Sequence, residues 1–185
     1  MNRSQRRLMR MKGEIEDILD ALSERGYINL ELYSEEDFYL GRGSYSLYVV
    51  KVRMKGDSLN RPYVLKIIEL DTGSTRSDLS LKRERSKNEI EKLKKYWDRV
   101  RGCMEEGSLI NVLGIYNVDF EDVGESYGLV LMEYYGENLR DYMEKEISEG
   151  EKIELLKGVL NGLKCLKGKG IIYTDLYCSH KKLDK

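Results

Sequence analysis

The spacing of hydrophobic residues changes several times along this chain, and the order of those changes constrains the fold more than any other feature. Helical spacing before Gly26 gives way to two runs rich in Val, Ile, Leu and Tyr, at Tyr45–Arg53 and Tyr63–Leu70. These runs predict two strands joined by a turn. Residues 71–80 are polar and predict a loop, and apolar residues along one stripe then predict a charged helix over residues 82–101.

The second half of the chain begins with strand patterns and ends with helical ones. Strands are predicted at Ile110–Val118 and Gly128–Tyr134, and a short helix is predicted near Asn138. Apolar residues at helical spacing predict an amphipathic helix over residues 151–167, and Ile171–Tyr173 predicts a short strand. Strands, one helix, strands and then helices indicate an α+β fold arranged in two lobes.

Composition narrows the classes of protein to which the chain can belong. Its 185 residues include 32 Lys and Arg against 33 Asp and Glu, so no strong net charge attracts nucleic acid or an anionic membrane. No apolar run approaches the roughly 20 residues that span a bilayer, and the N-terminus lacks the apolar segment of a signal peptide. Three scattered cysteines do not predict a disulfide framework, and a single histidine does not predict a His/Cys metal site. We therefore expect a cytoplasmic protein in a reducing compartment.

The first twelve residues carry positive charges and no acid. The basic residues are Arg3, Arg6, Arg7, Arg10 and Lys12. A short charged terminus is typical of a solvated, disordered tail, which is our expectation here. A nucleic-acid-binding arm is the alternative, and strong salt dependence of binding would reveal it. Behind this segment, apolar residues at helical spacing predict a helix that closes near Gly26.

Three features between residues 41 and 89 carry candidate chemistry. Gly41 and Gly43 lie between strand-like runs, where two glycines allow a tight turn whose N–H groups approach a phosphate; an ordinary hairpin turn has the same pattern. Strand alternation puts Lys66 on one face with Val64 and Ile68, where an ammonium requires an anion unless it reaches water at a sheet edge. Glu89, at the margin of the apolar stripe of the long helix, is the candidate anion, although it also fits a solvated helix face.

These residues line up with the motifs of the protein kinase family. Gly41, Gly43 and Ser46 resemble the glycine-rich loop, with Ser46 in place of the third glycine and Tyr48 in place of the usual valine. The segment Tyr63–Lys66 is similar to the strand that carries the phosphate-binding lysine. The segment Asn88–Leu93 is similar to the helix that supplies its glutamate partner, Glu89.

The resemblance continues toward the C-terminus and covers roughly residues 37–183. The segment Leu129–Gly136 resembles the strand and hinge of the family, which implies that Met132 is the gatekeeper and that the backbone of Glu133 to Tyr135 binds adenine. The segment Asn138–Tyr142 is similar to the helix after the hinge, and residues 151–176 are similar to the long C-lobe helix and the catalytic loop. The implied ligand is ATP, and the implied fold is an antiparallel-sheet N-lobe with one long helix and a helical C-lobe.

The catalytic-loop segment departs from the family pattern at several positions. Asp175 keeps the position of the catalytic base, whereas Thr174 replaces the arginine and Tyr177 replaces the lysine of the motif. His180 replaces the asparagine that binds Mg²⁺, a cation that prefers oxygen ligands. The chain ends at Lys185 before any Asp-Phe-Gly motif.

These departures indicate a truncated kinase or a pseudokinase that binds ATP, with Mg²⁺ only if other ligands hold it. The alternative is an active protein kinase completed by missing sequence or by a partner. The expected domains are a basic tail and helix (1–36), a kinase N-lobe (37–133), and a hinge with a partial C-lobe (134–185). The expected partners are a nucleotide and a protein substrate or partner. The helices that cover the helix over 151–167 in the kinase family have no counterpart in this sequence. The apolar face of this helix therefore also predicts a homodimer.

Overall fold

The computed structural model describes residues 3–42, 46–72, 77–105, 112–136, 142 and 145–172, apart from the side chains of residues 3, 4, 72, 77–83, 85, 89 and 105. The chain forms two compact units. The first comprises residues 1–96 and 111–136, and the second comprises residues 97–110 and 137–185. The boundary between the units falls within helix α2 (Ser77–Glu105).

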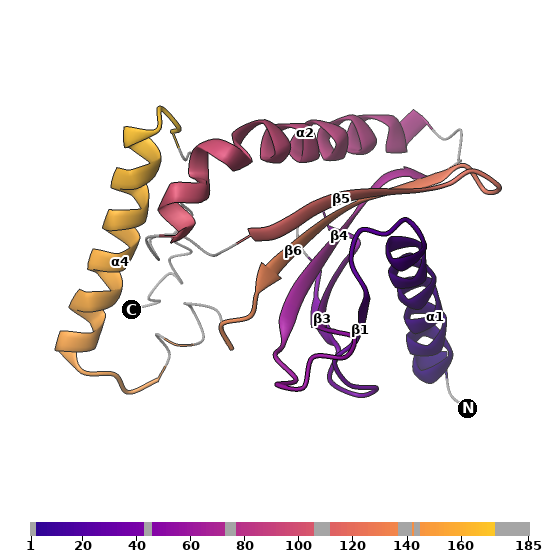
Figure 1. Ribbon diagram of the computed structural model, residues 1–185, viewed down its shortest axis with the longest axis horizontal. Helices are drawn as coiled ribbons and strands as arrows, with labels where there is room; N and C mark the ends of the chain where they lie inside the picture. Colours follow the sequence, from indigo (N-terminus) through magenta and orange to yellow (C-terminus); the bar gives the residue numbers. More distant parts are fainter. Residues whose placement is uncertain are drawn as a thin grey trace, which may run out of the picture. The chain divides into compact units, whose positions relative to one another are not determined.

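The first unit is built on an antiparallel sheet (Figure 1). The strand order is β1 (Leu30–Leu32), β3 (Tyr48–Met54), β4 (Tyr63–Thr72), β6 (Glu125–Glu133) and β5 (Val112–Phe120). Strand β2 (Tyr39–Gly41) also pairs with β3. The α+β class predicted from the sequence is confirmed, and β3, β4, β5 and β6 lie within a few residues of the predicted strands.

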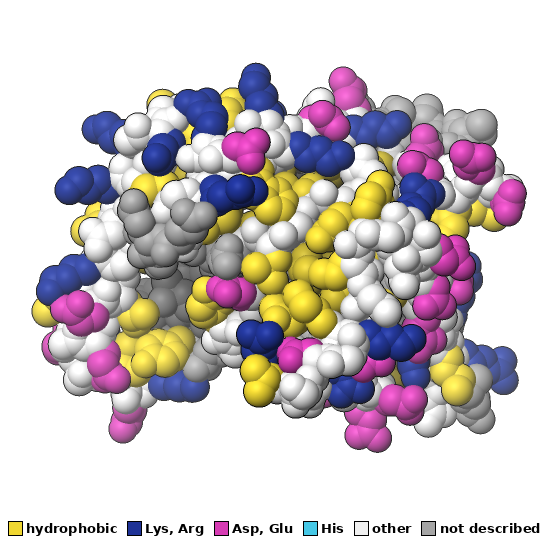
Figure 2. Space-filling view, in the orientation of Figure 1, with side chains coloured by type: hydrophobic (Ala, Val, Ile, Leu, Met, Phe, Trp, Pro, Cys, Tyr) yellow, Lys and Arg dark blue, Asp and Glu magenta, His cyan; other side chains and the backbone are white. Residues whose placement is uncertain are grey.

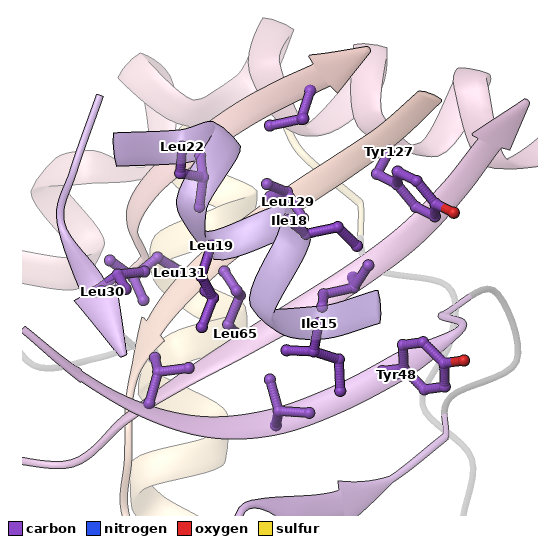
Figure 3. Packing of buried hydrophobic residues seen from close by; sticks show 14 of the residues in the cluster. Ile15, Ile18, Leu19, Leu22, Leu30, Tyr48, Leu65, Tyr127, Leu129 and Leu131 are labelled. Atoms are coloured by element: carbon purple, nitrogen blue, oxygen red, sulfur yellow. The ribbon is translucent and has the colours of Figure 1, made fainter. Parts of the chain in front are cut away.

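Helix α1 (Arg3–Glu24) covers one face of the sheet. Ile15, Ile18, Leu19 and Leu22 recur at helical spacing, so they lie on one side of the helix and are fully buried. They pack against alternate residues of the strands, among them Leu65, Leu129 and Leu131 (Figure 3). At roughly 1.5–3 kcal/mol for each buried aliphatic side chain, this cluster is the main core of the unit.

Helix α2 packs on the opposite face of the sheet. Ile90 joins a second buried cluster with Ile68, Leu70 and Val130. The helix comes close to the strands at Gly128, where an added Cβ would lie 2.5 Å from Cγ1 of Ile90. The absence of a side chain at residue 128 therefore sets the distance between helix and sheet.

The second unit contains helix α4 (Glu149–Gly168) and the last turns of α2. Ser148 caps α4 in a capping box, in which Ser148 and Glu151 exchange hydrogen bonds between side chain and backbone. A disulfide joins Cys103 of α2 to Cys165 of α4, with the two Cα atoms 5.9 Å apart. The side chain of Arg99 also donates a hydrogen bond to the carbonyl oxygen of Lys169.

Four predictions made from the sequence differ from the structure. The basic residues from Arg3 onward belong to α1, and not to a disordered tail, because the helix continues past its buried stripe through good helix formers. Helix α2 begins before the predicted residue 82 and ends after residue 101. Ile171 and Ile172 are not in a strand, and they follow a turn at Lys169 and Gly170 that ends α4. A disulfide forms that the cysteine spacing did not predict. Its two cysteines are 62 residues apart in sequence and become neighbours only when their helices pack.

Candidate functional site

The face of the sheet under α2 contains the lysine singled out in the sequence. Lys66 lies in the middle of β4, paired with Val49 of β3 and Val130 of β6. Its neighbours Leu65 and Ile67 belong to the cluster under α1, so alternation places Lys66 on the α2 face with Val64 and Ile68. The side chain is half-buried and has an interaction partner. An ammonium on this largely apolar face is suited to hold an anionic group.

The helix over this face contains the proposed partner of Lys66. Glu89 directly precedes Ile90, whose side chain packs in the cluster with Ile68 and Val130. The backbone of Glu89 therefore lies in the part of α2 that covers the sheet, and its side chain lies outside the described residues. On the same helix, the buried hydroxyl of Ser86 has no hydrogen-bond partner among the described residues. The sequence prediction of a Lys66–Glu89 pair stays a prediction.

Gly41, the first glycine of the predicted glycine-rich turn, is among the described residues. Gly41 ends β2 opposite Val49 and has φ of +136°, a backbone conformation that favours glycine. An added Cβ at Gly41 would meet no atom within 4 Å, so the space beside this backbone is open. Ser46 is buried, and the neighbouring Leu47 N–H donates to the Ile67 carbonyl at 2.8 Å. Gly43 lies outside the described residues.

The hinge-like segment follows directly from β6. Met132 pairs with Val64 and packs against the cluster under α2, so it lies on the same face as Lys66. Glu133 ends the strand, and its carboxylate accepts a 2.6 Å hydrogen bond from the hydroxyl of exposed Tyr135. The structure thus brings Met132 to the face of Lys66, and it places Glu133 and Tyr135 at the end of the strand. Asp175 lies outside the described residues.

A second lysine on this face was missed by sequence reasoning. Lys51 pairs with Val64 across β3 and β4, and its ammonium forms a 2.6 Å ion pair with Asp37. The ammonium also lies 5.3 Å from the ring centroid of Tyr33 and 5.0 Å from that of Tyr134. The hydrogen bond to Asp37 raises the pKa of Lys51, against the opposing effect of burial. The signal in the sequence was a lysine within an apolar strand run, the same signal that identified Lys66.

Tyr48, one of the residues aligned with the kinase motifs, lies on the face of the sheet that α1 covers. Tyr48, in the position of the usual valine of the glycine-rich loop, pairs with Ile67 and is buried in the cluster under α1. Its hydroxyl donates a 2.9 Å hydrogen bond to Glu14. Val49, the next residue along β3, is the one that lies opposite Lys66. The aliphatic side chain on the Lys66 face is therefore that of Val49.

This face combines a positive charge with apolar surface. Lys66 supplies a positive charge, Val64 and Met132 supply apolar surface, and Gly41 leaves open space beside the turn. Within the described ranges, no three His, Cys, Asp or Glu side chains are grouped to hold a metal ion. None of the helices in the part of the chain described here combines the length and hydropathy of a membrane span.

Comparison of the sequence with models of known protein families and with curated proteins gave no match.

Proposed function

We propose that this chain is a protein kinase-like protein that binds ATP on the α2 face of its sheet. The observation that carries the proposal is the position of Lys66, at the centre of the strand order and on the face that α2 covers. A half-buried ammonium between aliphatic neighbours suits a ligand that has phosphates and an apolar ring. The order of strands and the helix that follows the lysine strand are compatible with the kinase-like N-lobe that the motifs imply.

In this proposal, the two ends of the nucleotide contact different elements. The phosphates lie between Lys66 and the turn that begins at Gly41, with Glu89 orienting the ammonium. The adenine lies against Val64 and Met132 and takes its hydrogen bonds from the backbone that follows Glu133. The Lys51–Asp37 pair beside Tyr134 would hold the start of this segment in place, because it fixes the aromatic ring against β3.

We also propose that the protein binds nucleotide without efficient transfer of phosphate. Phosphoryl transfer depends on positioning and on charge stabilisation, mostly by lysine, arginine and metal ions. Thr174, Tyr177 and His180 lack the charges or the ligand type of the residues that they replace, and only Asp175 keeps its role as candidate base. An active protein kinase is the alternative. In either case the partners are a nucleotide and a protein, and the expected location is the cytoplasm, where reduction would open the Cys103–Cys165 disulfide.

Thermal unfolding with and without ATP tests nucleotide binding. ATP should raise the melting temperature of the wild type, since a ligand that binds only the folded state stabilises it. The shift should persist in Lys92→Met, an exposed lysine of α2, and disappear in Lys66→Met. Magnesium should add little. An equal shift in Lys66→Met, or no shift in any of these proteins, would remove the proposed site.

Catalysis is tested separately with labelled γ-phosphate and a generic protein substrate. We expect no incorporation above that of an Asp175→Asn control. Robust incorporation that depends on Asp175 would favour the active-kinase alternative, and ATP binding through Lys66 would remain valid.

A further inference from the structure

A cavity of about 730 Å³ opens on the α1 face of the sheet, opposite the face of Lys66. Residues of α1 line one side, and the first residues of β3 and the paired ends of β4 and β6 line the other. This volume is in the range of pockets that bind small organic molecules. None of the residues proposed to bind ATP lines it.

Two buried tyrosines and the carboxylates that they contact form the floor of this cavity. The Tyr48 hydroxyl donates to Glu14 at 2.9 Å, and the Tyr127 hydroxyl donates to Glu125 at 2.8 Å and contacts Glu14 at 3.5 Å. Figure 3 shows the two hydroxyls pointing to the same side, away from the apolar core. Glu69 also lines the cavity. The floor therefore carries the negative charges of Glu14 and Glu125. The contacts shown for these two carboxylates among the described residues come from tyrosine hydroxyls.

Three arginines form the exposed rim. Arg7 and Arg10 lie three residues apart on α1, and Arg42 follows β2 with its guanidinium 5.9 Å from the ring centroid of Tyr48. Burial and the hydrogen bond to Glu14 raise the pKa of Tyr48 to about 12, while the charges of Arg42 and Arg10 oppose this rise.

At Glu14 and Glu125, the negative charges of the floor are not paired with the described arginines of the rim. Among the described side chains, no ion pair within 4.0 Å joins these three arginines to Glu14 or Glu125. Opposite charges held apart across a cavity create a field that favours a ligand with the complementary separation of charge. Leu8, Met11 and Leu47 also line the cavity and add apolar surface to it.

We propose that this cavity binds a small zwitterionic molecule, whose amine contacts the Tyr–Glu floor, whose phosphate contacts the arginine rim, and whose body is apolar. A guanidinium fork matches a phosphate through paired hydrogen bonds, and an ammonium donates to carboxylates and hydroxyls. The cavity and Lys66 lie on opposite faces of the sheet, while Arg42 of the rim directly follows Gly41 of the proposed ATP site.

Titration calorimetry of the full chain with 4-(2-aminoethyl)phenyl phosphate tests this assignment. The probe has an amine, an aromatic body and a phosphate. Tyramine lacks the phosphate, and 4-ethylphenyl phosphate lacks the amine. We expect saturable binding of the complete probe and about tenfold or greater weakening when either charged group is removed.

Variants locate the site. Arg10→Gln should weaken the complete probe about tenfold, while Arg6→Gln, on the same helix but outside the cavity lining, and Lys66→Met should bind it as the wild type does. Both arginines are exposed, so both variants are expected to fold. Absence of saturable binding, equal affinity for either single-charge compound, equal effects of the two arginine variants, or loss of binding in Lys66→Met would each overturn the proposal.

Discussion

Lys51 shows how a charged residue is held within an apolar face. Its side chain is only 8% exposed, whereas Asp37, its partner, is 75% exposed. The ammonium is therefore the group that loses hydration, and the carboxylate and the rings of Tyr33 and Tyr134 replace it. These contacts tie β3 to the loop before β2 and to the segment after β6.

Tyr48 supplies a prediction on pH dependence. Burial, and then the hydrogen bond to Glu14, raise its pKa to about 12. A tyrosine ionises near pH 10 in an unfolded chain. The stabilisation is thus complete below about pH 10 and is lost as the pH rises toward 12.

Between about pH 10 and pH 12, the free energy of unfolding measured with urea should fall by on the order of 1–3 kcal/mol more in the wild type than in Tyr48→Phe. The variant cannot ionise at residue 48, and the other tyrosines titrate in both proteins. Parallel stability curves for the two proteins would contradict the hydrogen-bonded, buried position of Tyr48.

Single residues of the candidate site were predictable only in part. Alternation in the sequence was enough to place Lys66 with Val64 and Ile68, because a strand has a fixed period of two. The face of Tyr48 was not predictable from the motif, since the pairing of β3 with β4 decides it and a shift of one residue reverses every side chain. The partner of Lys51 was also not predictable, because Asp37 reaches it from a loop.

At the scale of elements, the contact between α2 and the sheet depends on Gly128. Its hydrogen side chain lets Ile90 pack directly on β6. Gly128→Ala should destabilise the protein by about 1–3 kcal/mol, because Ile90 is fully buried and has little room to move.

Gly158→Ala is the matched control for this substitution. Residue 158 lies in the exposed interior of α4, where an added Cβ meets nothing within 4 Å. Alanine should stabilise this helix by about 0.5–1 kcal/mol. Urea unfolding followed by circular dichroism measures both variants, and a neutral Gly128→Ala would contradict the close packing of α2 on the sheet.

The long elements were predictable because each has a sustained period of apolar residues. The apolar stripes of α1 and α4 and the alternation in β4 indicated the type of each element. The ends of α4 and β4 shifted by a few residues, whereas α1 begins at Arg3, within the segment predicted as a tail. The short strands β1 and β2 were not predicted, because three residues carry too little pattern. The Cys103–Cys165 disulfide depends on packing between two helices, which periodicity does not encode.

At the scale of the whole molecule, charges of both signs are nearly balanced in the sequence. Figure 2 shows basic and acidic side chains interspersed over the visible face, with hydrophobic side chains gathered in the middle of the view. This distribution agrees with the near balance of 32 basic and 33 acidic residues.

The apolar side chains of α4 carry a prediction about assembly. Ile153, Leu156 and Leu160 are more than half exposed, and Val159 lies beside them on the helix. An exposed apolar stripe of this kind is typical of an interface. We expect the chain to form a dimer at micromolar concentration, to lose it in Leu160→Asp, and to keep it in Lys164→Asp. A folded monomer of 21.6 kDa by light scattering would contradict this prediction.

The position of Lys66 beside nucleotide phosphates is the central claim, and chemical labelling tests it most directly. An acyl phosphate derivative of ATP transfers its acyl group to a lysine amine that lies next to the bound phosphates. Mass spectrometry of the digested protein should find the label on Lys66, reduced by excess ATP and absent in Lys66→Met. Label confined to other lysines such as Lys51 or Lys12, or label on Lys66 that ATP does not reduce, would contradict the account.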